Sequence, residues 1–182
     1  MRVTKLVIPD LVLFEPKIFL DERGMFYESF RQQLFEEATD QQAVFVQDNQ
    51  TSSVRGVLRG LHYQLPPKAQ GKLVRVLAGE IYDVAVDIRK HSPTFGHWIG
   101  ERLSAENKRQ LWVPSGFAHG FVVLSEQADV LYKTTEYYAP ELERCIRWDD
   151  PDLAITWPIE GEPILSAKDQ QGHMFAAASL FP

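Results

Sequence analysis

Short β-rich segments recur along the whole chain and are separated by turn residues, and this pattern constrains the fold more than any other feature. Many short strands at close spacing are typical of an all-β sandwich or barrel. The expected strands are Leu11–Phe14, Met25–Phe30, Ala43–Thr51, Gly56–Gln64, Lys72–Ala78, Glu80–Ile88, His97–Leu103, Gln110–Val113, His119–Leu124, Ala128–Thr135 and Cys145–Trp148.

One segment, Gln32–Thr39, has helical spacing of its apolar residues, and a second short helix is expected near Pro163–Asp169. The 182 residues contain no repeat and no linker that would divide them. This length fits one domain, so we expect a single domain over residues 1–182.

Several expected strands combine an apolar face with a face that mixes polar and aromatic side chains. In Glu80–Ile88, the residues Asp83 and Asp87 alternate with valines and Ile88, because successive side chains of a strand point to opposite faces. A barrel with a polar-lined lumen explains this pattern, and so does a sandwich with one solvated face. Alternation alone favours neither.

Two cations and an imidazole, Arg59, Lys72 and His62, lie among the apolar residues of two expected strands. Arg59 and His62 would point to opposite faces of an unbroken strand. Gly60 lies between them, and glycine inside a strand often marks a bulge. We therefore predict a shift of register at Gly60 that turns both side chains into one cavity.

Composition excludes some functions. A net charge of −6 and a pI near 5.4 do not suggest a nucleic-acid or membrane surface, so an anionic ligand requires a local cluster of Arg and Lys. The only cysteine, Cys145, cannot form an intramolecular disulfide, which fits the reducing cytoplasm. The N-terminal apolar residues are interrupted by Pro and acidic residues, which is unlike a signal peptide, and are expected to form strands.

His62 has two interpretations from sequence alone. It could be a hydrogen-bonded structural histidine or a general base, for which its ordinary pKa near 6.5 is suitable. A basic histidine needs a carboxylate that fixes its tautomer and stabilises the imidazolium. Asp83, Asp169 and Glu143 are all available, and the sequence does not choose between them.

The segment VPSGFAHGFVVL is rich in turn residues and delivers His119 at the start of a strand. With Gly56–Val84, it resembles the two signature segments of the cupin superfamily of small β-barrels. Metal-binding cupins usually carry His-x-His in the first segment, but here that position reads His62, Tyr63, Gln64. We therefore expect no zinc or iron site.

A closer resemblance covers nearly the whole chain. The chain resembles the dTDP-4-dehydrorhamnose 3,5-epimerase family in FLDERG, LRGLHYQ, GKLVRVLAGEIYDVAVDIRKHSPTFG, LWVPSGFAHGF, YKTTEYY, IRWDDPDLAITWP and LSAKD, in that order. The resemblance implies an all-β, cupin-type double-stranded β-helix, a jelly-roll barrel with a few short peripheral helices.

The resemblance also implies an activity: inversion at C3 and C5 of dTDP-4-dehydro-6-deoxy-D-glucose, in dTDP-L-rhamnose biosynthesis. His62 would be the base and Asp169 its orienting carboxylate. Lys72 would stabilise charge on the C4 oxygen, and Tyr132 would be the acid on the opposite sugar face. No cofactor and no metal are implied. Without the resemblance, Tyr132 would be a packing residue, Lys72 a strand-edge charge and Asp169 a solvated charge.

Further residues match family positions that would bind the substrate. Arginine suits the diphosphate because of its bidentate geometry. The expected substrate-binding residues are Arg23, Phe26, Glu28, Gln47, Asp48, Asn49, Arg59, Lys72, His119, Tyr138, Glu143 and Lys168. A homodimer is implied, with N-terminal strands at the interface, and Arg23 could then act in the partner's site.

Three other functions remain open from the sequence. One is a mono-epimerase that inverts only C5 or only C3, and another is a 3,4-ketoisomerase on the same dTDP-sugar. The third is a non-enzymatic sugar-binding cupin or a metal-dependent dioxygenase. Proton exchange on the substrate and activity in the presence of a chelator would separate these functions.

Overall fold

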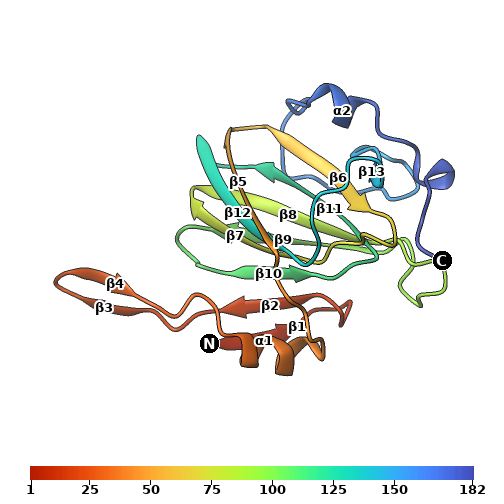
Figure 1. Ribbon diagram of the computed structural model, residues 1–182. Helices are drawn as coiled ribbons and strands as arrows, with labels where there is room; N and C mark the ends of the chain where they lie inside the picture. The colour runs from red at the N-terminus through yellow and green to blue at the C-terminus, as the bar shows by residue number, and fades with distance from the viewer.

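The computed structural model describes residues 1–182, and most of its regular secondary structure is strand (Figure 1). The strands are β1 (Arg2–Lys5), β2 (Val12–Glu15), β3 (Phe19–Asp21), β4 (Gly24–Phe26), β5 (Gln47–Val54), β6 (Leu58–Gln64), β7 (Lys72–Ala78), β8 (Glu80–Asp87), β9 (Trp98–Ser104), β10 (Gln110–Val113), β11 (Phe117–Val123), β12 (Gln127–Thr134) and β13 (Glu143–Cys145). The helices are α1 (Gln32–Thr39), α2 (Ala167–Gln170) and a 3-10 turn, η1 (Phe175–Ala177).

Two sheets form the body of the molecule. One has the strand order β1-β2-β10-β7-β12-β5, and the other has the order β13-β6-β11-β8-β9. All pairings in both sheets are antiparallel. Consecutive strands repeatedly change sheet, as β5 to β6 and β11 to β12 do, which is the connectivity of a rolled-up barrel. The all-β prediction is confirmed.

The principal core fills the space between the two sheets. Val74 and Val130 from the larger sheet pack in the same cluster as Ala85, Leu103 and Phe121 from the smaller one. A second cluster lies on the other face of the smaller sheet, where the segment after β13 covers it. Between the two sheets, Arg59, His62 and His119 of the smaller sheet and Asn49 and Lys72 of the larger one line a common cavity. The structure therefore has the barrel with a polar-lined lumen.

Helix α1 closes the outer face of the larger sheet. Its Phe35 is buried against Phe14 of β2 and Trp112 of β10, with ring centroids 5.9 and 4.9 Å away. The prediction of a helix at Gln32–Thr39 is confirmed to the residue. The second expected helix is also present, but it begins four residues later than Pro163 and ends one residue after Asp169, at Ala167–Gln170. No helix here combines the length and apolarity needed to cross a bilayer.

Most strand boundaries lie within two residues of expectation, but three predicted strands differ by more. The strand predicted at Met25–Phe30 is wrong beyond Phe26, because β4 pairs only with the three-residue β3 in a separate hairpin. This hairpin projects from the body of the molecule, at the left of Figure 1. The strand predicted at Ala43–Thr51 begins only at Gln47, and the last strand is Glu143–Cys145 instead of Cys145–Trp148.

Candidate active site

A cavity of about 370 Å³ opens into the lumen between the two sheets. Of the residues predicted to form the site, those that line it are Gln47, Asn49, Arg59, His62, Lys72, His119, Tyr132, Tyr138, Glu143 and Lys168. They come from six strands, α2 and the segment after β12. The fold thus brings together residues from positions 47 to 168 of the chain.

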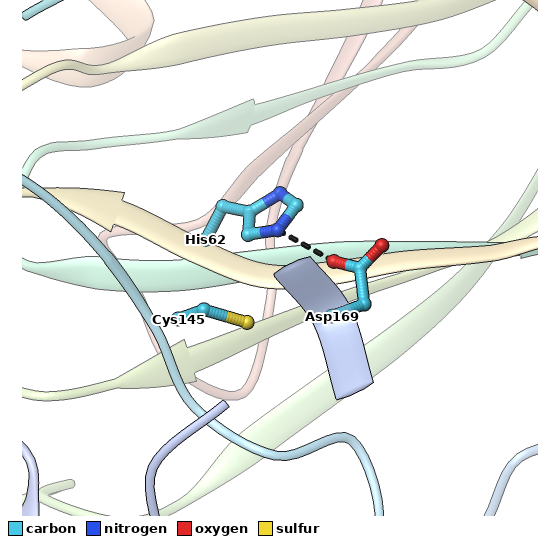
Figure 2. A group of neighbouring side chains, drawn as sticks. All are labelled: His62, Cys145 and Asp169. Carbon is cyan, nitrogen blue, oxygen red and sulfur yellow. Dashed lines mark ion pairs between the residues drawn. The ribbon is translucent and has the colours of Figure 1, made fainter. Parts of the chain in front are cut away.

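His62 and Asp169 form a pair at one wall of this cavity. Nε2 of His62 lies 2.7 Å from Oδ1 of Asp169 and has no other protein partner (Figure 2). Asp169 is almost fully buried behind the ring, whereas a quarter of the His62 side chain is exposed. Of the three carboxylates available from sequence, Asp169 is the one that contacts His62.

The environment of Asp169 keeps it ionised. Burial alone would raise its pKa, but His62, Ser166 and the amide of Gly60 lower it to about 2. The Ser166 hydroxyl donates to Oδ2 at 2.6 Å, and the Gly60 amide donates to Oδ1 at 3.2 Å. Ser166 also caps α2 by accepting from the Asp169 amide. A fixed anion behind an imidazole is the arrangement that stabilises a protonated ring.

Cys145 is the third member of this cluster. Its sulfur lies within 4.8 Å of the ligand atoms of His62 and Asp169, and Figure 2 shows it pointing toward the pair. Burial raises the pKa of this thiol to about 12. A thiol that keeps its proton at neutral pH is a poor nucleophile. The geometry therefore describes a His–Asp pair backed by an inert thiol.

Lys72 is a buried cation in the same cavity. Its Nζ donates to the backbone carbonyl of His62 at 3.1 Å. Burial lowers its pKa to about 8, while the nearby carboxylates of Glu143 and Asp83 act in the opposite direction. The ammonium is consequently charged at neutral pH but held in a poorly solvated position, where it would interact strongly with an anion.

Tyr132 reaches the cavity from the larger sheet, opposite the sheet that carries His62. It is paired with Asn49 of β5 and Val74 of β7. Burial raises the pKa of its hydroxyl, and the charge of Arg59 partly offsets this effect. A tyrosine that stays protonated on the wall opposite a histidine base can deliver a proton to the other side of a bound molecule.

A second histidine–carboxylate pair lies on the cavity floor. His119 of β11 is the cross-strand neighbour of His62. Its Nε2 lies 2.9 and 3.0 Å from the two oxygens of Asp83, which is fully buried in β8. Asp83, one of the three candidate partners of His62, therefore positions His119 instead.

A polar network of Tyr138, Glu143 and Lys168 borders the cavity. Glu143 accepts from Tyr138 at 2.7 Å and forms an ion pair with Lys168. Burial would raise the pKa of Glu143, but these two contacts and His62 lower it. The backbone amide of Tyr138 donates to Gln47 at 3.2 Å. These contacts hold an aromatic ring and an ion pair at one end of the site.

The predicted register shift at Gly60 is confirmed. His119 pairs with His62, but Phe121 pairs with Arg59, so the register slips by one residue between them. Gly60 has a φ of +128°, and a Cβ there would lie 2.5 Å from Cα of Gly120. Only two glycines allow these strands to approach so closely. Arg59 and His62 both line the cavity as a result.

Four of the predicted substrate-binding residues do not reach this chain's cavity. Arg23 and Phe26 lie on the projecting hairpin, where the Arg23 side chain is 85% exposed and pairs with Asp21. Glu28 pairs with Arg31. Asp48 lies on the other face of β5 from its neighbours and binds Lys133 at 3.0 Å.

Sequence reasoning missed five residues of the cavity wall, which are Thr51, Tyr63, Gln64, Gln70 and Phe121. Alternation contained the signal for two of them, because Thr51 shares a face with Asn49 and Phe121 shares one with His119. Gln64 has a structural role. Its amide donates to the carbonyls of Lys68 and Tyr137 and accepts from the Ala139 amide.

The chain is similar to proteins of known activity. A family model described as dTDP-4-dehydrorhamnose 3,5-epimerase matches residues 5–177. A relative of that name from Pseudomonas aeruginosa is 63% identical over all of both chains. A dTDP-4-dehydrorhamnose 3-epimerase from Streptomyces niveus is 37% identical and covers 98% of this chain and 86% of its own.

Solved structures agree with these matches. The 3,5-epimerase of Legionella pneumophila, in complex with dTDP-4-keto-L-rhamnose, superposes with a TM-score of 0.94. It is 54% identical and the match covers 98% of this chain and 94% of that one. The fold is thus the cupin-type jelly-roll barrel expected from sequence. The chain belongs to the dTDP-4-dehydrorhamnose 3,5-epimerase family.

Proposed function

We propose that this protein is a cofactor-independent isomerase that inverts C3 and C5 of dTDP-4-dehydro-6-deoxy-D-glucose to give dTDP-4-dehydro-L-rhamnose. The observation that carries the proposal is the placement of the His62–Asp169 pair and Tyr132 on opposite walls of one cavity. An epimerase must remove a proton from one face of a carbon and return one to the other. A base and an acid on opposite walls meet that requirement.

His62 takes the proton from C3 or C5. Both carbons lie next to the C4 ketone, so loss of either proton gives an enolate. Because Asp169 stays ionised, it stabilises the imidazolium that forms on His62. The exposed edge of the ring faces the cavity, while the carboxylate closes the other side. This division of tasks is that of a general base with an orienting anion.

Lys72 stabilises the enolate. Its charge is buried and close to the base, so a negative oxygen at C4 would gain more from it than in water. His119, held by Asp83, offers a second polar group on the floor. Proton transfer beside a ketone then needs no nicotinamide, flavin or metal, and activity should survive a chelator.

Tyr132 returns a proton to the opposite face of the carbon. Burial raises the pKa of its hydroxyl, so the group is protonated when the enolate forms. After transfer, the phenolate regains a proton and His62 loses one, which restores the starting state. The same two groups can then act at the second carbon, because both carbons share the C4 ketone.

The nucleotide lies toward the polar ends of the cavity. Arg59 supplies a guanidinium for the diphosphate, and Gln47 and Asn49 supply amides on the face of β5 that lines the lumen. The half-exposed ring of Tyr138 offers a stacking surface for thymine at the rim. Lys168 and Glu143 border the same end. The single buried thiol supports a cytoplasmic location.

The enzyme acts as a homodimer in this proposal. The projecting hairpin exposes four large apolar side chains, Phe19, Leu20, Met25 and Phe26, between 52% and 80% exposed. Apolar surface of this kind usually marks an interface. In a symmetric dimer, Arg23 and Glu28 near the same hairpin could reach the partner's cavity instead of their own.

A mixed dimer tests this arrangement. Arg23→Ala and His62→Ala subunits should each be nearly inactive alone, and mixing them should restore up to about a quarter of the activity through one intact composite site. The control mixes His62→Ala with Asp169→Asn. These two residues belong to the cavity of one chain, so no mixed dimer of these variants has an intact site. Recovery in neither mixture would show that each site is built by one chain.

Proton NMR of the substrate in heavy water tests the reaction itself. The proposal expects deuterium at both C3 and C5 and the L-lyxo product after trapping with a reductase. The 3-epimerase relative makes a mono-epimerase the second candidate, and exchange at one carbon alone would favour it. Exchange at neither carbon would contradict the enzymatic function.

A further inference from the structure

Arg59 lines the cavity with an exposed side chain and is held there in an unusual way. Its Nε and one terminal nitrogen donate to the hydroxyl of Ser53 at 3.2 and 3.1 Å. No carboxylate forms an ion pair with its guanidinium. The other cavity cation at the polar rim, Lys168, is neutralised by Glu143. Arg59 therefore reaches the cavity with its full charge and with three N–H donors unused.

Ser53 is well placed to fix this side chain. It lies in β5 of the larger sheet, is 7% exposed and shares a face with Asn49 and Thr51, which line the cavity. Arg59 lies in β6 of the smaller sheet. The two hydrogen bonds thus cross from one sheet to the other at the end of the lumen where Gly56 turns the chain.

We propose that Ser53 is a positioning residue that holds the Arg59 guanidinium aimed into the cavity without neutralising it, so that Arg59 can bind the diphosphate of the substrate. This inference rests on the proposed function. A neutral hydroxyl is suited to this task because it accepts two N–H bonds and adds no charge. An aspartate at position 53 would hold the Arg59 guanidinium as firmly, but its carboxylate would compete with the phosphate oxygens for that guanidinium.

The charge of Arg59 also acts on Tyr132, whose pKa it lowers against the effect of burial. The guanidinium is therefore close enough to the proposed acid for its position to matter to the chemistry as well as to binding. A guanidinium that swings away from Ser53 would weaken both.

A double-mutant cycle tests the proposal, with dTDP as the probe and calorimetry as the measurement. Ser53→Ala should weaken dTDP binding by about tenfold, because the Arg59 guanidinium is no longer held in a fixed direction. Ser53→Thr keeps the hydroxyl and should retain wild-type affinity. In an Arg59→Ala background, Ser53→Ala should have no further effect, because the residue acts only through Arg59.

The controls separate this idea from its alternatives. Ser52→Ala changes the exposed face of the same strand and should leave affinity unchanged. Thermal melting shows whether Ser53→Ala is folded, and Ser53→Thr carries the comparison if it is not. Equal dTDP affinity in Ser53→Ala and wild type, or full additivity with Arg59→Ala, would overturn the proposal. Failure of wild type to bind dTDP would instead contradict the proposed function.

Discussion

Nε2 of His62, on a central strand, lies 2.7 Å from Oδ1 of Asp169, on a short helix near the end of the chain. The carboxylate is also tied to the Gly60 amide, two residues before the histidine. One side chain thus fixes both the ring and the backbone that carries it. Several consequences of this site can be measured.

Tyr132→Phe should separate the two halves of the reaction. His62 can still remove a proton from C3 or C5, but the acid on the opposite wall is gone. We expect deuterium to enter the substrate with retention of configuration, while product formation falls by about 10²–10⁴-fold. NMR in heavy water measures both quantities in one sample. Loss of exchange together with inversion would contradict the assigned acid.

Asp169→Asn should impair the His62 base without preventing nucleotide binding. The amide cannot stabilise an imidazolium, so kcat should fall by about 10²–10⁴-fold. Affinity for dTDP should change little, because Asp169 lies behind His62 and does not line the cavity. Calorimetry with dTDP provides the control. Near-normal turnover in this variant would rule out the proposed dyad.

The pH dependence should reflect Lys72. Burial lowers its pKa to about 8, so the ammonium is charged below that value and loses its proton above it. We expect kcat/KM to fall as the pH rises through about 8. Lys72→Arg keeps a charge at high pH, and its remaining activity should be flat from about pH 7.5 to about pH 9. The same decline in both proteins would assign the titration elsewhere.

Asp87 should contribute to stability rather than to catalysis. Burial would raise its pKa, but hydrogen bonds from Arg89, Ser92 and Thr94 lower it from 3.8 to about 2. Its stabilising effect is therefore present above about pH 4 and is lost as the pH falls toward 2. Asp87→Asn should cost roughly 2 kcal/mol at neutral pH and much less near pH 2. Urea unfolding at both pH values measures the difference.

Gly60→Ala should damage both fold and activity. The new Cβ would lie 2.8 Å from the His119 carbonyl, at a φ of +128° that favours glycine. We expect a loss of about 2–4 kcal/mol in unfolding free energy and a displaced Arg59. Gly161→Ala is the matched control, since its φ is +75° but nothing lies within 4 Å. Equal effects would mean that close strand approach is unimportant.

Much of this site could be predicted because it obeys local rules. A glycine between Arg59 and His62 indicated the register shift, and strand alternation placed Tyr132 in the lumen. The same rule separates Asp48 from Gln47 and Asn49, since neighbours in a strand point to opposite faces. Applied throughout, it would also have found Thr51.

Other features could not be predicted because they depend on how distant segments pack. Without the family resemblance, which implied Asp169, the sequence does not choose between Asp83 and Asp169 as the partner of His62. The path of the C-terminal segment decides between them. The placement of Arg23 depends on a hairpin that leaves the body of the molecule. Local sequence determines that the hairpin forms, but it does not determine which surface the hairpin contacts.

Both large sheets are complete by Cys145, yet Asp169 follows only after a further wrapping segment. That segment returns to the barrel through a bridge between Ile164 and Val57, next to β6. During synthesis, a nascent chain could therefore present every strand of the barrel before it possessed a working base. Turnover would then depend on the docking of the last segment. A protease that trimmed this segment would remove the carboxylate partner of His62 and uncover the outer face of the smaller sheet.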